Sequence, residues 1–187
     1  TVFSSIDSHG RYKYGSQAHA AQWNLARLAD SLLPLLHKDS EKAVKLAEVA
    51  IQGYSVTFNY AWIKGMRCKL GLFGEEVDDF SLAQSLLDWM QTSKAHYTKT
   101  FRDLIQENIP QNEIYNSPVF QKWYMLWKAR LTRNSKPIEA SFCLMRDSNP
   151  VITPNNHYVE EVLAAGEGGD LKPFLALLEA LKNPFEE

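Results

Sequence analysis

The sequence has little of what marks secreted, membrane-spanning or nucleic-acid-binding proteins. Only two cysteines, Cys68 and Cys143, occur among 187 residues, which favours a reducing compartment over a framework of disulfides. No apolar run approaches the roughly 20 residues needed to span a bilayer, and no segment has the pattern of a signal peptide. The formal net charge of -2 gives no reason to expect nucleic acid or an anionic membrane as a partner. We therefore expect a soluble, cytoplasmic protein.

The patterns of common enzyme sites are missing as well. None of the five histidines pairs with another histidine or a cysteine at metal-ligand spacing. The sequence contains no Walker loop, nucleophile elbow or dinucleotide fingerprint. The acidic run at 75–79 could hold a hard cation, but it lacks the spaced ligands of a calcium loop and lies where a helix N-terminus favours negative charge. The residues alone do not predict a self-sufficient enzyme.

What the sequence does have is helical periodicity, with 45% hydrophobic and 12% aromatic residues. Apolar spacing and capping signals predict helices that start near Ser16, Asp39, Asp78, Tyr97, Ser117, Pro137, Asn156 and Asp170. No segment alternates strictly between apolar and polar residues, and no repeat has a fixed period. We predict an all-α fold, an irregular bundle of about seven to eight helices. Residues 1–16 are expected to be an extended segment and residues 17–187 a single α-helical domain.

Individual positions add detail to these helices. Gly53 and Gly65 fall inside the second helix and indicate either close packing or a break, whereas Gly71 with Gly74 indicates its end. The third helix is expected to turn inward Phe80, Ala83, Leu86, Leu87 and Met90. The helix after Ser117 is expected to bury Phe120, Trp123, Tyr124, Trp127 and Leu131. Both cysteines have an apolar helical context, so we expect small core or near-core residues, with a regulatory disulfide between them as the alternative.

The helix after Ser117 also lies in a stretch, residues 114–138, that carries basic residues and no acid. The cations there are Lys122, Lys128, Arg130, Arg133 and Lys136. Aromatic side chains interleaved with cations can stack on bases and contact phosphates. The aromatic residues, however, fall on one helical stripe, as core residues do. Two interpretations follow: a core helix with a solvated basic face, or a surface for nucleic acid or phosphate.

The segment from Ser4 to Gln17 is polar and interrupted by glycine, yet it is dense in aromatic and charged groups. Its glycines permit unusual backbone angles around Arg11, whose guanidinium group could bind a phosphate or carboxylate through two hydrogen bonds. The candidate cleft-lining residues are Gly10, Arg11, Tyr12 and Gln17. The alternative is a loop that docks across the helical core.

Residues 4–29 resemble the pattern SSID…GRYxYGxQ…WNLARLA of the selenoprotein-O-like protein adenylyltransferases. Shorter matches follow in the same order: MRCKLGL at 66–72, YTKTFR at 97–102, and NPVI with NNHYVEE between 149 and 161. Asn155 stands where the family pattern has arginine. The similarity covers essentially the whole chain. It marks as family positions with structural roles Trp23, Asn24, Lys69, Asn156 and His157.

The resemblance implies the helical C-lobe portion of a kinase-like enzyme. Such an enzyme binds ATP in an inverted orientation with Mg²⁺ or Mn²⁺ and transfers AMP to Ser, Thr or Tyr hydroxyls of proteins. In the family, the residues that grip the nucleotide and metal precede the segment that matches at Ser4, so no catalytic or metal-binding residue is assigned here. The sequence begins at Thr1 rather than Met, and we expect a longer parent polypeptide. Its upstream ATP-binding region would be the partner of this chain.

Three functions follow from these patterns. In the first, this chain binds no cofactor and is inactive alone, while the parent polypeptide modifies protein substrates. The second is a non-catalytic helical module that binds a protein or peptide. The third and least favoured is binding of nucleic acid through the basic aromatic helix at 118–136.

Overall fold

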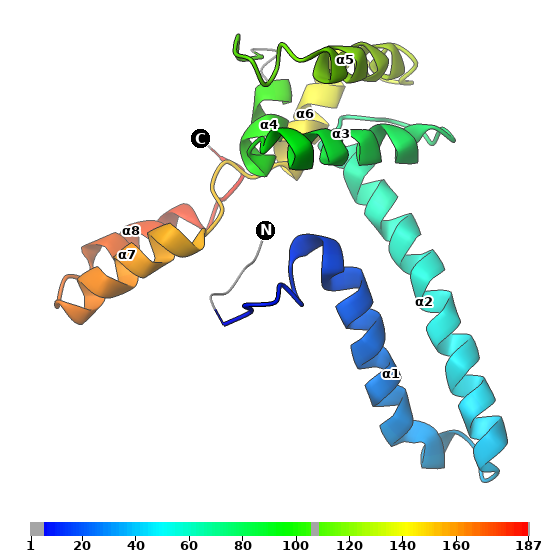
Figure 1. The fold of residues 1–187 in the computed structure, drawn as a ribbon. Coiled ribbons are helices and arrows are strands. Elements are labelled where there is room, and N and C mark those ends of the chain that lie inside the picture. Colours follow the sequence, from blue (N-terminus) through cyan, green and yellow to red (C-terminus); the bar gives the residue numbers. More distant parts are fainter. Residues whose placement is uncertain (1–5, 106–108, 187) are drawn as a thin grey trace. The chain divides into compact units, whose positions relative to one another are not determined.

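The computed structural model describes residues 6–105 and 109–186 (Figure 1). These residues form eight α-helices and a short 3-10 helix, η1, and none of them is in a strand, which confirms the predicted all-α class. The chain divides into two compact units, residues 1–62 and 63–187. The boundary falls within the region expected to be one domain, 17–187, and that expectation stays a prediction.

The first unit contains η1 (Tyr14–Ser16), α1 (Gln17–Leu36) and most of α2 (Ser40–Lys69). Ser16 is the N-cap residue of α1, as predicted, but its hydroxyl makes no capping hydrogen bond. Pro34 lies in the last turn, and α1 ends two residues later, as expected for a residue that restricts helix continuation. Asp39 precedes α2 and caps it, because its carboxylate accepts hydrogen bonds from the N–H groups of Glu41 and Lys42 at 3.0 and 3.2 Å.

The two glycines inside α2 cause neither a break nor a close contact, so that prediction was wrong. The helix is continuous over 30 residues, and a Cβ built at Gly53 or Gly65 would meet nothing within 4 Å. The predicted end at Gly71 is confirmed. Leu72 N–H donates to Arg67 C=O at 2.8 Å and Gly71 N–H donates to Cys68 C=O at 3.1 Å, the paired bonds of a Schellman motif.

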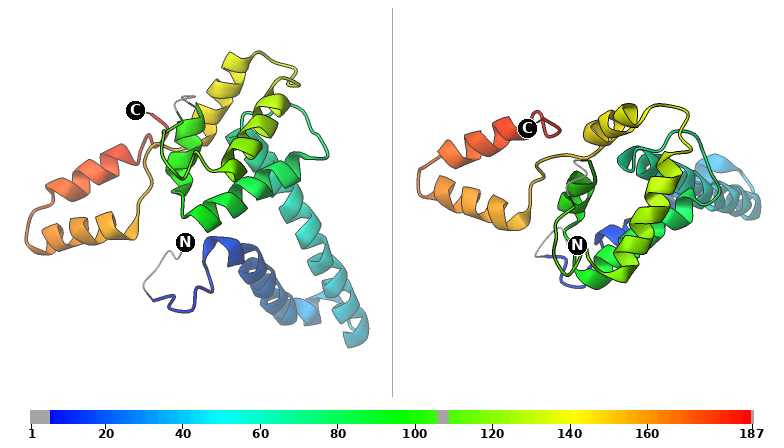
Figure 2. Two further views of the ribbon diagram at one scale, coloured as in Figure 1. Left: turned by 45° about the horizontal axis from the view of Figure 1, so that its top comes forward. Right: turned by 90° about the horizontal axis from the view of Figure 1, so that it is seen from above.

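The second unit contains the end of α2 and six further helices (Figure 2). They are α3 (Asp79–Ser93), α4 (Tyr97–Ile105), α5 (Pro118–Leu131), α6 (Ile138–Ser148), α7 (Asn156–Glu167) and α8 (Lys172–Ala180). All six begin within two residues of the predicted starts; the predicted end of the fourth helix at Glu107 lies outside the described residues. Helix α3 packs against α5, α4 against α6, and α7 lies beside α8.

The core of the second unit is built around three buried tryptophans. Each indole N–H finds an acceptor: Trp89 donates to Ser117 Oγ at 3.3 Å, Trp123 to Leu82 C=O at 2.9 Å, and Trp127 to Leu70 C=O at 2.9 Å. Large rings can be buried without an unpaired polar group when such acceptors are present. The aromatic stripe of α5 is therefore a core stripe, as the first of its two interpretations had it.

Two predicted core positions differ from the structure. Tyr124 of α5 is only half-buried. Phe80 of α3 is 48% exposed, because the buried face of that helix centres on Asp79, Ala83 and Leu86 and Phe80 lies at its edge. The predicted buried face of α3 included apolar residues only, whereas the carboxylate of Asp79 is also buried on that face.

The carboxylate of Asp79 is the centre of a buried ion-pair network. Its Oδ1 accepts from Arg130 Nε at 2.7 Å, and its Oδ2 accepts from Arg67 Nε at 2.7 Å and from the Glu76 N–H at 3.0 Å. Glu75 pairs with Arg67, and Glu76 pairs with Arg133. The acidic run thus holds arginines in place of a metal cation. Arg130 is 2% exposed, so the predicted solvated basic face of α5 was wrong for this residue.

Asn134 links the same network to the turn after α2. Its Nδ2 donates to Gly71 C=O and to Ser141 Oγ, both at 2.8 Å, and its Oδ1 accepts from Phe73 N–H and Arg130 Nη1 at 3.0 and 2.9 Å. A single side chain therefore holds the loop after α2, the end of α5 and the start of α6 together.

We predict that Gly71→Ala destabilises the second unit more than Gly74→Ala does. Both glycines have positive φ, so each alanine costs about 1 to 2 kcal/mol of backbone strain. At Gly71 the added Cβ would also lie 2.8 Å from Ser141 C=O, whereas at Gly74 it would meet nothing within 4 Å. Urea unfolding followed by tryptophan fluorescence should show an additional loss of about 1 kcal/mol or more at Gly71. Equal losses of unfolding free energy in the two variants would show that the contact with Ser141 C=O does not add to the destabilisation.

We also predict that Asp79→Asn lowers the free energy of unfolding by about 3 to 5 kcal/mol at neutral pH, because the buried Arg130 would lose its carboxylate partner at 2.7 Å and keep only that of Glu76, at 3.3 Å. Asp88→Asn, on the exposed face of the same helix, is the control and should change it by less than about 0.5 kcal/mol. Chemical denaturation of both variants measures the difference.

The loss of stability caused by Asp79→Asn should become smaller as the pH falls. Burial works against the charged form of Asp79, but hydrogen bonds from Arg130, the Glu76 N–H and Arg67 outweigh it and lower the pKa of this carboxyl. The stabilisation is thus fully present above the unfolded-state pKa, about 3.9, and is lost as the pH falls through the lower folded-state pKa. The gap between the wild-type chain and Asp79→Asn should narrow in that acid range. A gap that stays constant there would contradict the assigned role.

Candidate functional site

The loop before α1 is folded around the carboxylate of Asp7. Its Oδ1 accepts from Arg11 N–H at 2.7 Å and its Oδ2 accepts from Tyr12 N–H at 2.8 Å. Gly10 directly precedes Arg11 and has φ of 65°, and its N–H donates to Asp7 C=O at 3.0 Å. Since L side chains rarely adopt this angle, a glycine is needed where the chain turns back on Asp7. The turn fixes the backbone from which Arg11 projects.

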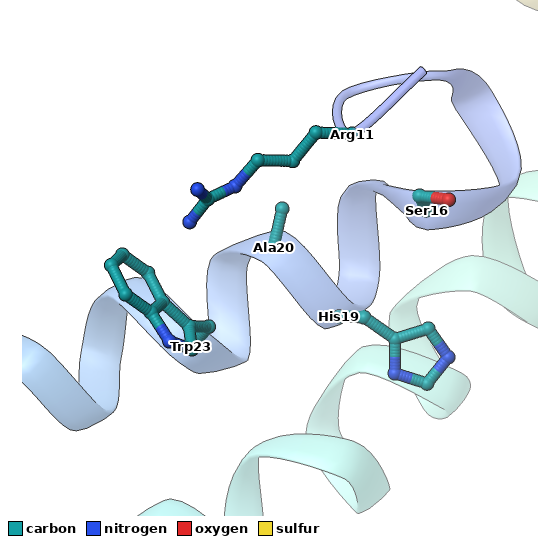
Figure 3. Close-up of a pocket in the computed structure, with 5 residues that line it drawn as sticks. All are labelled: Arg11, Ser16, His19, Ala20 and Trp23. Atoms are coloured by element: carbon teal, nitrogen blue, oxygen red, sulfur yellow. The ribbon is translucent and has the colours of Figure 1, made fainter. Parts of the chain in front are cut away.

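The side chain of Arg11 extends along α1 to the ring of Trp23 (Figure 3). Its guanidinium carbon lies 4.5 Å from the centroid of that ring and 5.5 Å from the ring of Tyr12. Arg11 and Trp23 line a shallow pocket of about 360 Å³, together with Ser16, His19 and Ala20. Ala20 is buried, and its small side chain lies beneath Arg11. The pocket is an open, partly aromatic surface with a cation along one side.

The charges around this pocket do not cancel. Both oxygens of Asp7 are taken by backbone N–H groups. A second arginine, Arg27, also approaches Trp23, at 5.7 Å, but it is paired with Asp30 at 2.9 Å. Among the described residues, the guanidinium of Arg11 has no carboxylate partner. An exposed guanidinium over an aromatic ring can bind an anion through its in-plane N–H donors.

The structure brings together some of the predicted site residues in this unit and not others. Arg11 and Tyr12 share the Trp23 ring cluster, and Gly10 shapes their loop. Gln17 and Asn24 are exposed on α1 and do not line the pocket. Trp23, for which a structural role was expected, is 51% exposed. Whether these residues line a cleft stays a prediction.

Three pocket residues were not singled out from the sequence as lining a site: Ser16, His19 and Ala20. The signal that could have found them is their spacing. Together with Trp23 they stand at i, i+3, i+4 and i+7, which is one face of a helix. That face becomes informative only once Arg11 is known to lie across it.

Lys69, the last residue of α2, belongs to the second unit and is partly buried. Its Nζ donates to Ser148 C=O at 3.3 Å and lies 4.7 Å from the centroid of the Phe101 ring. Burial lowers the pKa of Lys69 to about 8. The neighbouring Asn149 donates to Lys69 C=O at 2.9 Å, while its Oδ1 is buried without a hydrogen-bond partner among the described residues. The structural role expected for Lys69 stays a prediction.

The first turn of α7 holds two further family positions, Asn156 and His157, both exposed. His157 Nε2 lies 3.2 Å from Glu161 Oε1, one turn along the helix. The preceding Asn155 caps the helix, since its Oδ1 accepts from Tyr158 N–H at 3.0 Å. Arginine, which the family pattern has at this position, carries only donors and could not make that bond. This substitution thus replaces a cation with a helix cap.

The cysteines are both free thiols, and the prediction of core positions was wrong for one of them. Cys68 is half-buried, whereas Cys143 is exposed on α6, where its Sγ lies 3.2 Å from Arg146 Nη2. Helix α6 contributes few residues to the core, so an apolar spacing there does not ensure burial.

Neither a metal site nor a membrane span is found in the parts of the chain that the structure describes. Residues 6–105 and 109–186 contain no group of three or more His, Cys, Asp or Glu residues placed to hold a metal ion. Over the same residues, every helix is too short or too polar to cross a bilayer.

Comparison with known proteins gives a consistent relationship along the whole sequence. The sequence model of the family described as protein adenylyltransferase SelO matches residues 2–182. The protein nucleotidyltransferase YdiU of Alcanivorax borkumensis is 47% identical over 100% of this chain and 39% of its own length. The protein of the same name from Nitrosococcus oceani is 49% identical over 100% of this chain and 38% of its own length. That of Bacillus cereus is 48% identical over 99% and 38%.

The chain therefore spans less than two fifths of the length of these relatives, and it matches them without a large gap at either end. Identity near one half over a full helical chain is far above the level at which fold and family become ambiguous. The order of the matched motifs, from the Asp7 loop to the first turn of α7, agrees with this relationship. The chain belongs to the SelO family of protein adenylyltransferases.

Proposed function

We propose that this chain is the helical portion of a longer protein adenylyltransferase, which transfers AMP from ATP to Ser, Thr or Tyr hydroxyls of cytoplasmic proteins. The observation that carries the proposal is the identity of 47 to 49% with nucleotidyltransferases over the whole chain. In this reaction the hydroxyl oxygen bonds to the α-phosphorus, the bond between the α- and β-phosphates breaks, and pyrophosphate leaves. The hydroxyl proton is lost to a base or to solvent.

The proposal places ATP and Mg²⁺ or Mn²⁺ in an upstream region of the parent polypeptide. The carboxylates here that best resemble a cation site do not fit one, because Glu75, Glu76 and Asp79 are each paired with arginine. No step of the reaction is assigned to a metal ion bound by these carboxylates. The role left to the second unit is that of a scaffold comparable to the helical C-lobe of a kinase-like fold. The Asp7 loop, with Arg11 and Tyr12, would lie at the cleft.

Exposed apolar side chains on α1 support a partner from the same polypeptide. The exposed leucines are Leu25, Leu28, Leu32, Leu35 and Leu36. They recur at helical spacing, which is typical of a face that packs against another element. Among the described residues of the first unit, this face is left exposed. Further polypeptide of the parent enzyme would cover it.

We predict that the parent polypeptide, incubated with protein substrate and Mg²⁺ or Mn²⁺, transfers label from ATP carrying ³²P at the α-phosphate. It should transfer none from ATP labelled at the γ-phosphate, because the leaving group carries that label away. The 187-residue chain alone should transfer neither. Transfer of the γ label would identify a kinase and overturn the proposal, as would transfer of the α label by the isolated chain.

A second candidate function is a non-catalytic helical module that binds a protein. The observation in its favour is the apolar surface of α7 and α8, where Leu163, Phe174, Leu175 and Leu178 are exposed. A reading frame that starts at this segment would favour the module, and an in-frame ATP-binding region upstream of it would favour the enzyme. Binding of nucleic acid has less support, because Arg130 and the aromatic stripe of α5 are committed to the core.

A further inference from the structure

We propose that the pocket beside Arg11 binds a phosphate group of a small anion, of the class of pyrophosphate or the terminal phosphates of a nucleotide. The inference that an anion binds here rests on the geometry of the first unit. The choice of phosphate rests on the proposed function, in which a nucleoside triphosphate enters and pyrophosphate leaves. The site consists of Arg11 and Trp23, with Ser16, His19 and Ala20 around them.

Among the described residues, the positive charge of Arg11 is not paired with a carboxylate. The nearest acid in its loop, Asp7, uses both carboxylate oxygens to accept the backbone N–H groups of Arg11 and Tyr12. The carboxylate positions the loop and keeps its charge, but among the described residues no ion pair joins it to the guanidinium of Arg11. Arg27, the other arginine near Trp23, differs in this respect because Asp30 neutralises it. Of the two, only Arg11 has its charge available to a ligand.

The guanidinium of Arg11 contacts two aromatic rings. It is within 4.5 Å of the Trp23 centroid and 5.5 Å of the Tyr12 centroid, and Figure 3 shows its side chain extended along α1 rather than out into solvent. Contact with a ring face leaves the N–H donors at the edge of the group free. These donors match two oxygens of a phosphate or carboxylate. Contacts with the two rings favour this extended rotamer of Arg11, which lowers the rotamer entropy lost on binding.

The pocket is open, with a volume of about 360 Å³, so a small anion can reach the guanidinium from solvent. The side chains of Ser16 and His19 also line the pocket, but Figure 3 shows them directed away from the guanidinium, so the charge of Arg11 is the main attraction for an anion. Anions of higher charge should bind more tightly to an uncompensated guanidinium, which favours pyrophosphate over acetate.

We predict saturable binding of pyrophosphate to the 187-residue chain, with shifts of the Arg11 Nε–H and Trp23 indole NMR signals. Sodium chloride at matched ionic strength is the baseline. Arg11→Gln should weaken binding about tenfold or more, since a charge-assisted, two-point contact is lost. Arg27→Gln is the matched control: it also removes an arginine near Trp23, yet it should leave the affinity within about twofold. Both sites are exposed, so circular dichroism should show unchanged helicity.

Further arms separate the sources of the phosphate group. Tighter binding of ATP than of pyrophosphate would indicate terminal phosphates of a nucleotide, and the reverse order would indicate the free product; both support the proposal. Acetate binding as tightly as pyrophosphate would overturn the choice of phosphate. Equal losses in the two arginine variants, or shifts that never saturate, would overturn the site itself. These results do not depend on AMP transfer, so they are distinguishable from a failure of the proposed function.

Discussion

The second unit depends on one buried carboxylate. Asp79 receives guanidinium groups from α2 and α5 and a backbone N–H from the loop between α2 and α3, so its two oxygens join α5, 51 residues away, to the end of α2 and the loop that follows it. The arrangement is closed, because Arg67, Arg130 and Arg133 face an equal number of carboxylates from the acidic run. Buried charges are tolerated only in such a balance, and removal of one member leaves its partner desolvated and unpaired.

Arg11 has the opposite environment, although it is the same type of residue. The guanidinium of Arg130 donates to a carboxylate and to backbone carbonyls, including that of Phe73 at 3.2 Å, and it is out of contact with water. The guanidinium of Arg11 touches aromatic rings, faces solvent and has lost its nearest acid to the backbone. The partners of each group decide its role. A guanidinium whose three nitrogens all donate within the fold stabilises it, while an exposed one without an ion-pair partner is available for a ligand.

The features that sequence predicted well are those that depend on near neighbours. The helix start at Ser117 and Pro118 follows from a hydroxyl cap and a fixed φ, and the end of α2 at Gly71 follows from a positive φ. The burial of Arg130 could not be predicted in this way, because its partner Asp79 lies 51 residues away. The exposure of Phe80 is a consequence of the same pairing, since the carboxylate beside it occupies the centre of the buried face.

The candidate site could also be predicted from the sequence only in part. The sequence singled out Arg11 from its glycine-interrupted loop, but not the helix face beneath it, because only the turn made by Asp7 lays that side chain along α1. Family membership marks Trp23 as a position of interest without saying what it contacts. Since the charged groups of the second unit's network neutralise one another, substitutions there should act through stability. The unpaired charge of Arg11 lies in the other unit, where a substitution can change binding and leave the helices intact. This separation is what allows scaffold and site to be tested independently in one chain.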